Sequence, residues 1–225
     1  AGLSIAARRY IRLGAGLLGV MILIFLVTIH PRIIADRPGD AFAARSMFGD
    51  FPGRLINFFK DLGLCGAAFL FSGAWSETRR TSGKYWVYDL GRVILATSIV
   101  AFGVLHFLYP AFGPGIPPMY ENVPWPVPGH LFWVFLTGAV FIVAGVSIMI
   151  KCWVHWTALW LAVVILLFLI VTWVPQFPAN PVLLYTGNWL KDFGIAGGVL
   201  VLAGTQRVGT TRCKPVREEC RQRVT

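Results

Sequence analysis

The sequence predicts an all-α integral membrane protein with six transmembrane helices, and three observations lead to that class. Only 13% of the 225 residues are charged, whereas 56% are apolar or aromatic; a soluble domain carries about 25% charged residues. Six apolar stretches each approach the length of about 20 residues that crosses a bilayer. Basic residues are concentrated in alternate connections between these stretches. The composition therefore excludes a disordered protein, a nucleic-acid-binding domain and an ordinary soluble enzyme.

The six stretches are separated by connections rich in Pro, Gly and charged residues. Tryptophan, whose amphipathic ring favours the headgroup level of a membrane, lies at or near many of the predicted helix ends. The predicted spans are Ile11–Ile29, Leu55–Trp75, Trp86–Tyr109, Leu131–Ile150, Trp153–Val174 and Trp189–Gly204.

The net charge of +10 is interpreted as membrane topology, because the basic residues lie between apolar runs. Arg8, Arg9 and Arg12 lie at the start of the first span, and six Lys and Arg residues follow the last one. Both ends of the chain are therefore predicted to be cytoplasmic. Connections 110–129 and 175–187 contain no Lys or Arg and are predicted to lie on the outer side.

Two segments of the chain repeat each other. The ten residues from Asn57 to Gly66 (NFFKDLGLCG) are matched by those from Asn188 to Gly197 (NWLKDFGIAG), and each copy follows an apolar stretch ending in Val-Thr-x-x-Pro. Two spans and their connection thus recur in the same orientation, unlike the inverted repeats of many secondary transporters. Because two more spans precede the second copy, the sequence predicts a tandem pair of four-helix units whose first unit lacks its first two helices.

The expected organisation follows from that repeat. Residues 1–84 form a two-helix half-repeat, residues 85–206 form a four-helix bundle beside it, and residues 207–225 form a basic cytoplasmic tail. Small residues four apart predict close helix contacts in both copies and in the first span. These seams are Gly63 with Ala67, Gly194 with Gly198, and Ala15 with Gly19.

The Lys-Asp pairs of the repeat are the first candidates for function, because ionisable groups inside a span are costly. They are Lys60 with Asp61 and Lys191 with Asp192. Adjacent residues on a helix do not face each other, so each is expected to find partners on other helices. A structural role is favoured: Asn57 and Asn188 are predicted N-caps, and the positive helix N-terminus stabilises the carboxylates. A ligand or proton role is the alternative.

Histidine is the next candidate, because it titrates near neutrality and ligates metals. His30, His106 and His130 all map to the predicted outer boundary, at the depth of Lys60 and Lys191. A satisfied interfacial side chain is the favoured interpretation of each. At the inner side, Asp89 and Arg92 are three apart and are expected to pair, and His155 is expected to join an interfacial aromatic face.

The outer connection 110–129 holds seven of the 14 prolines, which keep it from becoming helical. It is expected to be a stiff apolar cover that displays Tyr120 and Trp125. Three interpretations stay open: a lid over a lipid-facing pocket, a docking surface for another subunit, and a rigid connector in the headgroups.

The four cysteines are too few and too scattered to predict a disulfide framework. Cys65 and Cys152 lie in or beside apolar runs and are expected to act as small hydrophobic side chains. Cys213 and Cys220 match no usual zinc spacing, so no metal site is predicted.

Residues 86–204 resemble the DoxX family of membrane proteins. Leu90-Gly91-Arg92 is followed by His106 at the end of the same span, then by the Val-Pro-Trp-Pro-Val-Pro stretch from Val123, and finally by the repeat at Asn188. The resemblance implies a small four-helix protein of the bacterial inner membrane that accompanies redox or sulfur-handling enzymes; DoxD relatives belong to a thiosulfate:quinone oxidoreductase. By that analogy Arg92, His106, Lys191 and Asp192 are the positions to test. The two-helix N-terminal addition departs from the usual size.

Two functional hypotheses follow, and a small-molecule transporter is a third. The first is a DoxX-like subunit of a redox complex that meets the quinone pool, because a quinone site needs hydrogen-bond donors and a titratable group beside an apolar slot. The second is a non-catalytic structural or assembly subunit, since the sequence has no catalytic motif of its own. The candidates for quinone or proton chemistry are His106, Lys60, Asp61, Lys191, Asp192, Arg92 and His130, and those for docking are Tyr120 and Trp125.

Overall fold

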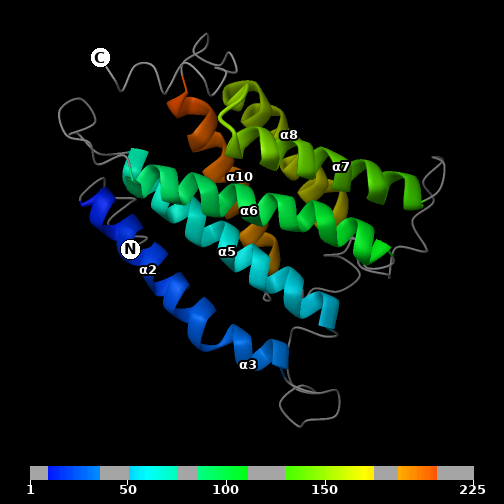
Figure 1. The fold of residues 1–225 in the computed structure, drawn as a ribbon, viewed down its shortest axis with the longest axis horizontal. Helices are drawn as coiled ribbons and strands as arrows, with labels where there is room; N and C mark the ends of the chain where they lie inside the picture. Colours follow the sequence, from blue (N-terminus) through cyan, green and yellow to red (C-terminus); the bar gives the residue numbers. More distant parts are fainter. Residues whose placement is uncertain (1–9, 36–50, 75–85, 111–129, 175–186, 207–225) are drawn as a thin grey trace, which may run out of the picture.

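The computed structural model describes residues 10–35, 51–74, 86–110, 130–174 and 187–206, and every element in these ranges is helical. Figure 1 shows the helices, which are long except for α3. In chain order they are α2 (Ile11–Thr28), α3 (His30–Ala35), α5 (Phe51–Ala74), α6 (Trp86–Leu108), α7 (His130–Met149), α8 (Val154–Trp173) and α10 (Asn188–Thr205).

The all-α prediction is confirmed, and all six apolar stretches form helices of 18 to 24 residues. Four helical stretches are long and apolar enough to cross a membrane: Ile11–Arg32, Gly53–Ala74, Trp86–Leu108 and Leu131–Met149. The chain thus has the composition of a membrane-embedded protein. The apolar run of α8, Val154–Ile170, is shorter, and α10 begins with polar residues, so six spans stay a prediction.

The chain runs back and forth, so that the helix ends gather at two ends of the molecule (Figure 1). One end holds the C-termini of α2, α6 and α8 and the N-termini of α5, α7 and α10; we call it the Lys60 end. The opposite end holds Arg92 near the start of α6, and we call it the Arg92 end. The predicted outer candidates therefore share one end of the bundle.

Five of the long helices form a closed ring in the order α5, α6, α7, α8 and α10, and α10 returns to α5. Helix α2 lies outside this ring and packs against α5. Helices α6 and α10 scarcely touch, because α5 lies between them. Helix α5 thus closes the ring that α6, α7, α8 and α10 share, and the division at residue 84 into a two-helix half-repeat and a four-helix bundle stays a prediction.

Glycines let the antiparallel helices α5 and α6 approach closely. A Cβ atom at Gly66 would lie 2.5 Å from the backbone nitrogen of Leu95, and one at Gly73 would lie 2.6 Å from that of Tyr88. Ser98 of α6 adds a hydrogen bond by donating its hydroxyl to Phe59 O, with an Oγ to O distance of 2.6 Å. This contact binds the first repeat copy to the rest of the chain.

The predicted small-residue seams are confirmed, and they relate the two repeat copies by an approximate two-fold axis. Gly198 of α10 meets Ala67 of α5, since an added Cβ would lie 2.4 Å from the alanine Cβ. An added Cβ at Gly63 would meet Ile195, and one at its counterpart Gly194 would meet Leu64, the counterpart of Ile195. Across the α5–α10 contact, equivalent residues of the two copies therefore make equivalent contacts.

Two local expectations were wrong. Helix α5 begins at Phe51, so Asn57 lies inside it and donates its side-chain amide to Gly53 O at 3.0 Å. The residue before α10 is Gly187, whose backbone is left-handed, and Asn188 is the first helical residue. Neither asparagine is therefore an N-cap.

The cysteines differ from each other. Cys65 is free and buried, as expected. Cys152 is disulfide-bonded, which the spacing of the cysteines in the sequence does not reveal.

The glycine contacts predict opposite outcomes for two equivalent substitutions. Gly66→Ala should lower the free energy of unfolding by about 1–3 kcal/mol, because the added methyl overlaps the backbone of α6. Gly197→Ala at the equivalent position meets no described atom within 4 Å, and it should leave stability unchanged or raise it by about 0.5–1 kcal/mol. Chemical unfolding of both variants in detergent micelles measures the difference. Equal effects would contradict the packing described here.

Candidate functional site

The Lys-Asp motifs of the two repeat copies pair reciprocally across the α5–α10 contact. Lys60 Nζ lies 2.8 Å from Asp192 Oδ1 and 2.9 Å from its Oδ2. Lys191 Nζ lies 2.7 Å from Asp61 Oδ1. Each lysine thus binds the aspartate of the other copy, which confirms that these residues find their partners on other helices.

Each aspartate also contacts a ring nitrogen from the helix that precedes its own. Trp173 at the end of α8 donates Nε1–H to Asp192 Oδ2 at 3.1 Å. His30 at the start of α3 places Nε2 3.3 Å from Asp61 Oδ2. The two ring-bearing residues follow the two Val-Thr sequences of the repeat, one and two positions later. In both copies, therefore, a ring nitrogen contacts the aspartate, but the ring is an indole in one copy and an imidazole in the other.

The two ion pairs differ in exposure. The side chains of Lys60 and Asp192 are 7% and 11% exposed, whereas that of Lys191 is 23% exposed. A buried charge is costly unless it is paired and hydrogen-bonded, and each carboxylate here has two such contacts. The near-equivalent pairs thus stand in different surroundings, with the Lys60–Asp192 pair deeper in the ring.

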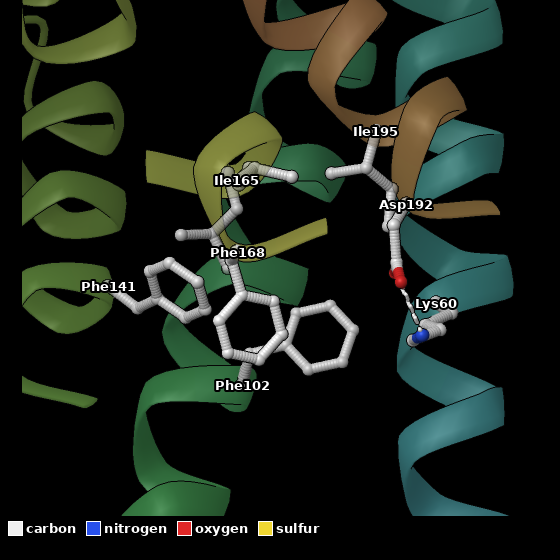
Figure 2. Close-up of a pocket in the computed structure, with 8 residues that line it drawn as sticks. Lys60, Phe102, Phe141, Ile165, Phe168, Asp192 and Ile195 are labelled. Carbon is white, nitrogen blue, oxygen red and sulfur yellow. Dashed lines mark hydrogen bonds and ion pairs between the residues drawn. The ribbon is translucent and has the colours of Figure 1, made fainter. Parts of the chain in front are cut away.

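The Lys60–Asp192 pair forms the polar wall of a small cavity inside the helix ring. Figure 2 shows three phenylalanine rings gathered on the opposite side, with isoleucine side chains above them. The volume is about 40 Å³, and a water molecule needs roughly 10–15 Å³ by this measure, so a few waters fit. The cavity is lined by Lys60, Ile99, Phe102, Phe141, Ile165, Phe168, Asp192 and Ile195.

His106 lies behind two of those phenylalanines. Its Nδ1 is 2.7 Å from Phe102 O, and its ring meets the Phe141 ring edge to face at a centroid distance of 5.6 Å. The residue is fully buried, and its Nε2 has no hydrogen-bond partner among the described residues. His106 therefore supports the aromatic wall and carries an unpaired polar atom beside it.

Arg92 lies at the opposite end of the molecule from Lys60 and does not contact the other candidate site residues that the structure describes. Its Nη1 donates to Ile148 O at 2.6 Å and to Met149 O at 3.0 Å. Its Nε lies 3.2 Å from Asp89 Oδ1, which confirms the expected pair. Because the last carbonyls of a helix have no partner within that helix, Arg92 completes the C-terminus of α7.

The remaining candidates are placed in part. His130 begins α7 at the Lys60 end, while Tyr120 and Trp125 lie outside the described residues. His155 places Nδ1 2.9 Å from Ala203 O, beside the exposed Trp156. Within the described ranges, no group of three or more His, Cys, Asp or Glu side chains is arranged to hold a metal ion.

Sequence reasoning missed the partners of the Lys-Asp motifs. Trp173 lies at a predicted helix end, where the membrane boundary alone accounts for a tryptophan, and in the sequence nothing separates Phe102, Phe141 and Phe168 from other apolar residues. The position of Trp173 two residues after Val171, inside the repeated Val-Thr-x-x-Pro pattern, was the only available hint.

No family model, curated protein or solved structure matches the chain. The DoxX resemblance therefore remains a hypothesis that rests on the short motifs quoted above. The geometry of the Lys60 end is the basis for a proposed function.

The buried pair predicts a non-additive response to substitution. Lys60→Met alone should lower stability by about 3–5 kcal/mol, because it leaves the Asp192 carboxylate buried without its cation. Adding Asp192→Leu removes the stranded charge, so the double variant should regain most of that loss. Thermal unfolding of the wild type, both single variants and the double variant in one detergent gives the coupling free energy. A double variant whose loss of stability equals the sum of the two single losses would show that the pair is not coupled.

Proposed function

We propose that the chain is a DoxX-like, six-span subunit of a redox-linked membrane complex, and that its Lys60–Asp192 cavity interacts with the ring of a membrane quinone. The observation that supports this is the juxtaposition of a buried ammonium–carboxylate pair with three phenylalanine rings (Figure 2). A polar edge opposite aromatic side chains is the pattern of small-molecule sites, in which a few polar groups orient an otherwise apolar ligand.

The residues present fit the chemistry of a quinone. Lys60 has three N–H donors, of which a quinone carbonyl accepts one, and Asp192 holds the ammonium in place. The phenylalanine faces pack against a flat ring. Reduction of a quinone takes up protons, and Lys60 and Asp192 are titratable groups at that edge. The electrons come from the parent complex, because an ammonium and a carboxylate orient a quinone and exchange protons but are not reductants.

The volume sets a condition on binding. A cavity of about 40 Å³ holds water molecules and not a quinone ring, so Phe102, Phe141 or Phe168 must rotate away from Lys60. These rings belong to α6, α7 and α8, and the α7–α8 contact is the least extensive in the ring of helices. We expect the ligand to enter between these two helices.

The proposed location is a bacterial inner membrane with both termini in the cytoplasm. The positive-inside distribution of Lys and Arg supports this orientation. It places the Lys60 end, and with it the cavity, toward the outer leaflet. The four apolar helical stretches support the membrane, and α8 and α10 are assigned as spans because they complete the same ring.

A structural or assembly subunit is the second candidate, and a specific observation favours it. Both ion pairs join α5 to α10, and every charged atom in them has a partner. Such a network can hold the two repeat copies together without any ligand. The two proposed functions make different demands on the two ion pairs. A purely structural role needs both pairs equally, whereas a quinone site needs only the Lys60–Asp192 pair.

Matched double variants separate the two functions. Lys60→Met with Asp192→Leu removes the polar wall of the cavity without leaving a stranded charge, and it should reduce retention of ubiquinone or menaquinone at least tenfold. Lys191→Met with Asp61→Leu removes the equivalent pair outside the cavity and should leave retention within twofold of the wild type. Native mass spectrometry of the gently solubilised chain, with quinone quantified after extraction, measures both.

Stability serves as the control. Both double variants should unfold within a few degrees of each other, since each loses one ion pair between the same helices. Equal quinone retention in the two variants, or a wild type that retains none from quinone-rich membranes, would leave the structural role as the function of the network.

A further inference from the structure

The approximate two-fold symmetry makes α10 the counterpart of α5, yet among the described helices a neighbour covers the outer side of α5 and none covers that of α10. Helix α6 covers α5 along Phe59, Gly63, Gly66, Leu70 and Gly73. The equivalent positions of α10 are Leu190, Gly194, Gly197, Val201 and Gly204. Leu190, Gly197 and Gly204 are exposed, so this face of α10 lacks the neighbour that its counterpart has.

The glycines show the difference directly. An added Cβ at Gly66 would lie 2.5 Å from Leu95 N of α6, and one at Gly63 would lie 2.8 Å from Ser98 Oγ. At Gly197 no described atom lies within 4 Å, and at Gly194 only Leu64 of α5 does. A glycine inside a helix costs about 0.5–1 kcal/mol relative to alanine. Within the described chain, no close contact of Gly197 offsets that cost.

Helix α2 gives a second, independent observation. Its counterpart α8 buries Leu161 and Ile165 on the side that faces the ring, with 1% and 8% exposure. The positions equivalent to them in α2, counted from the Val-Thr sequences, are Leu17 and Met21, which are 59% and 61% exposed. The side of α2 that corresponds to the inward side of α8 is therefore open.

Both open faces belong to the same half of the approximate two-fold arrangement. In the other half, the equivalent faces are covered by α6 and α7, which form an antiparallel hairpin. We infer that the outer faces of α2 and α10 bind a hairpin of two membrane helices of the α6–α7 type, whose first helix runs antiparallel to α10 and carries small residues against Gly197.

A second copy of this chain does not supply that hairpin. Its own α6 and α7 are engaged with α5 and with each other, and a Cβ at Gly103 would lie 2.6 Å from Gly138 O. Lipid fills apolar faces without needing glycines, and close approach through small residues is the hallmark of helix association in membranes. The inferred occupant is therefore a helical hairpin distinct from the α6–α7 hairpin of this chain.

Site-specific photo-crosslinking of the full chain in its own membranes tests this inference. Benzoylphenylalanine replaces Leu190 on α10 or Met21 on α2, and adducts are identified by tandem mass spectrometry. The expected result is that Leu190 and Met21 crosslink to the two successive helices of a single polypeptide, with Gly, Ala or Ser at the turn of helix nearest the Leu190 label. The same label at Val143, which is 69% exposed on α7, should give lipid adducts only.

A second substitution, Gly197→Leu in the Leu190-labelled chain, tests whether the adduct depends on close packing at Gly197. It should reduce the polypeptide adduct at least tenfold, while Val143→Leu leaves the adduct unchanged. Lipid adducts alone at positions 190 and 21, adducts to a second copy, or adducts to two unrelated polypeptides would each overturn the inference. The test does not depend on quinone, so its failure and the failure of the redox proposal are separate results.

Discussion

The reciprocal pairing of two Lys-Asp motifs is the interaction on which the arrangement of α5 and α10 depends. In a low-dielectric interior, four charged groups are tolerable only when each meets its partner. Because Lys and Asp are adjacent in each motif and point in different directions, both pairs form together at only one axial register of the two helices. A slip by one helical turn, about 5.4 Å, would break both. The small-residue contact of Gly198 with Ala67 then brings the backbones close at that same register.

The repeat gives one motif two environments. Both aspartates take a lysine from the other copy and a ring nitrogen from their own copy, so the charge arrangement is conserved between the halves. The surroundings differ because α6, α7 and α8 close around Lys60–Asp192, whereas Lys191–Asp61 lies toward α2 and α3. The cavity with aromatic walls lies where the ring of helices is complete. Any chemistry that is specific to the Lys60–Asp192 pair therefore comes from the helices around it, because the Lys-Asp motif itself is the same in both copies.

The sequence predicted the helices well, because apolar length and Pro or Gly connections are local signals. It also placed His30, His106 and the Lys-Asp motifs at one end, since depth in a membrane follows from position within a span. It did not predict that α5 lies between α6 and α10, because glycine spacing shows that a helix is closely packed but not against which partner. The N-cap assignments failed for a local reason: α5 starts six residues earlier than Asn57. The role of Trp173 and the phenylalanine wall depend on contacts between distant segments, which composition does not encode.

Helix α10 combines two surfaces with different tasks. Asp192, Ile195 and Val199 face the ring, where they set the register and line or support the cavity. Leu190, Gly197 and Gly204 lie on the exposed side. Lys60 and Asp192 already lie within hydrogen-bond distance, at 2.8 and 2.9 Å, so the ion pair holds the axial position of α10 without help from the exposed side. A hairpin bound at the exposed side and a ligand bound in the cavity would therefore contact different residues of the same helix.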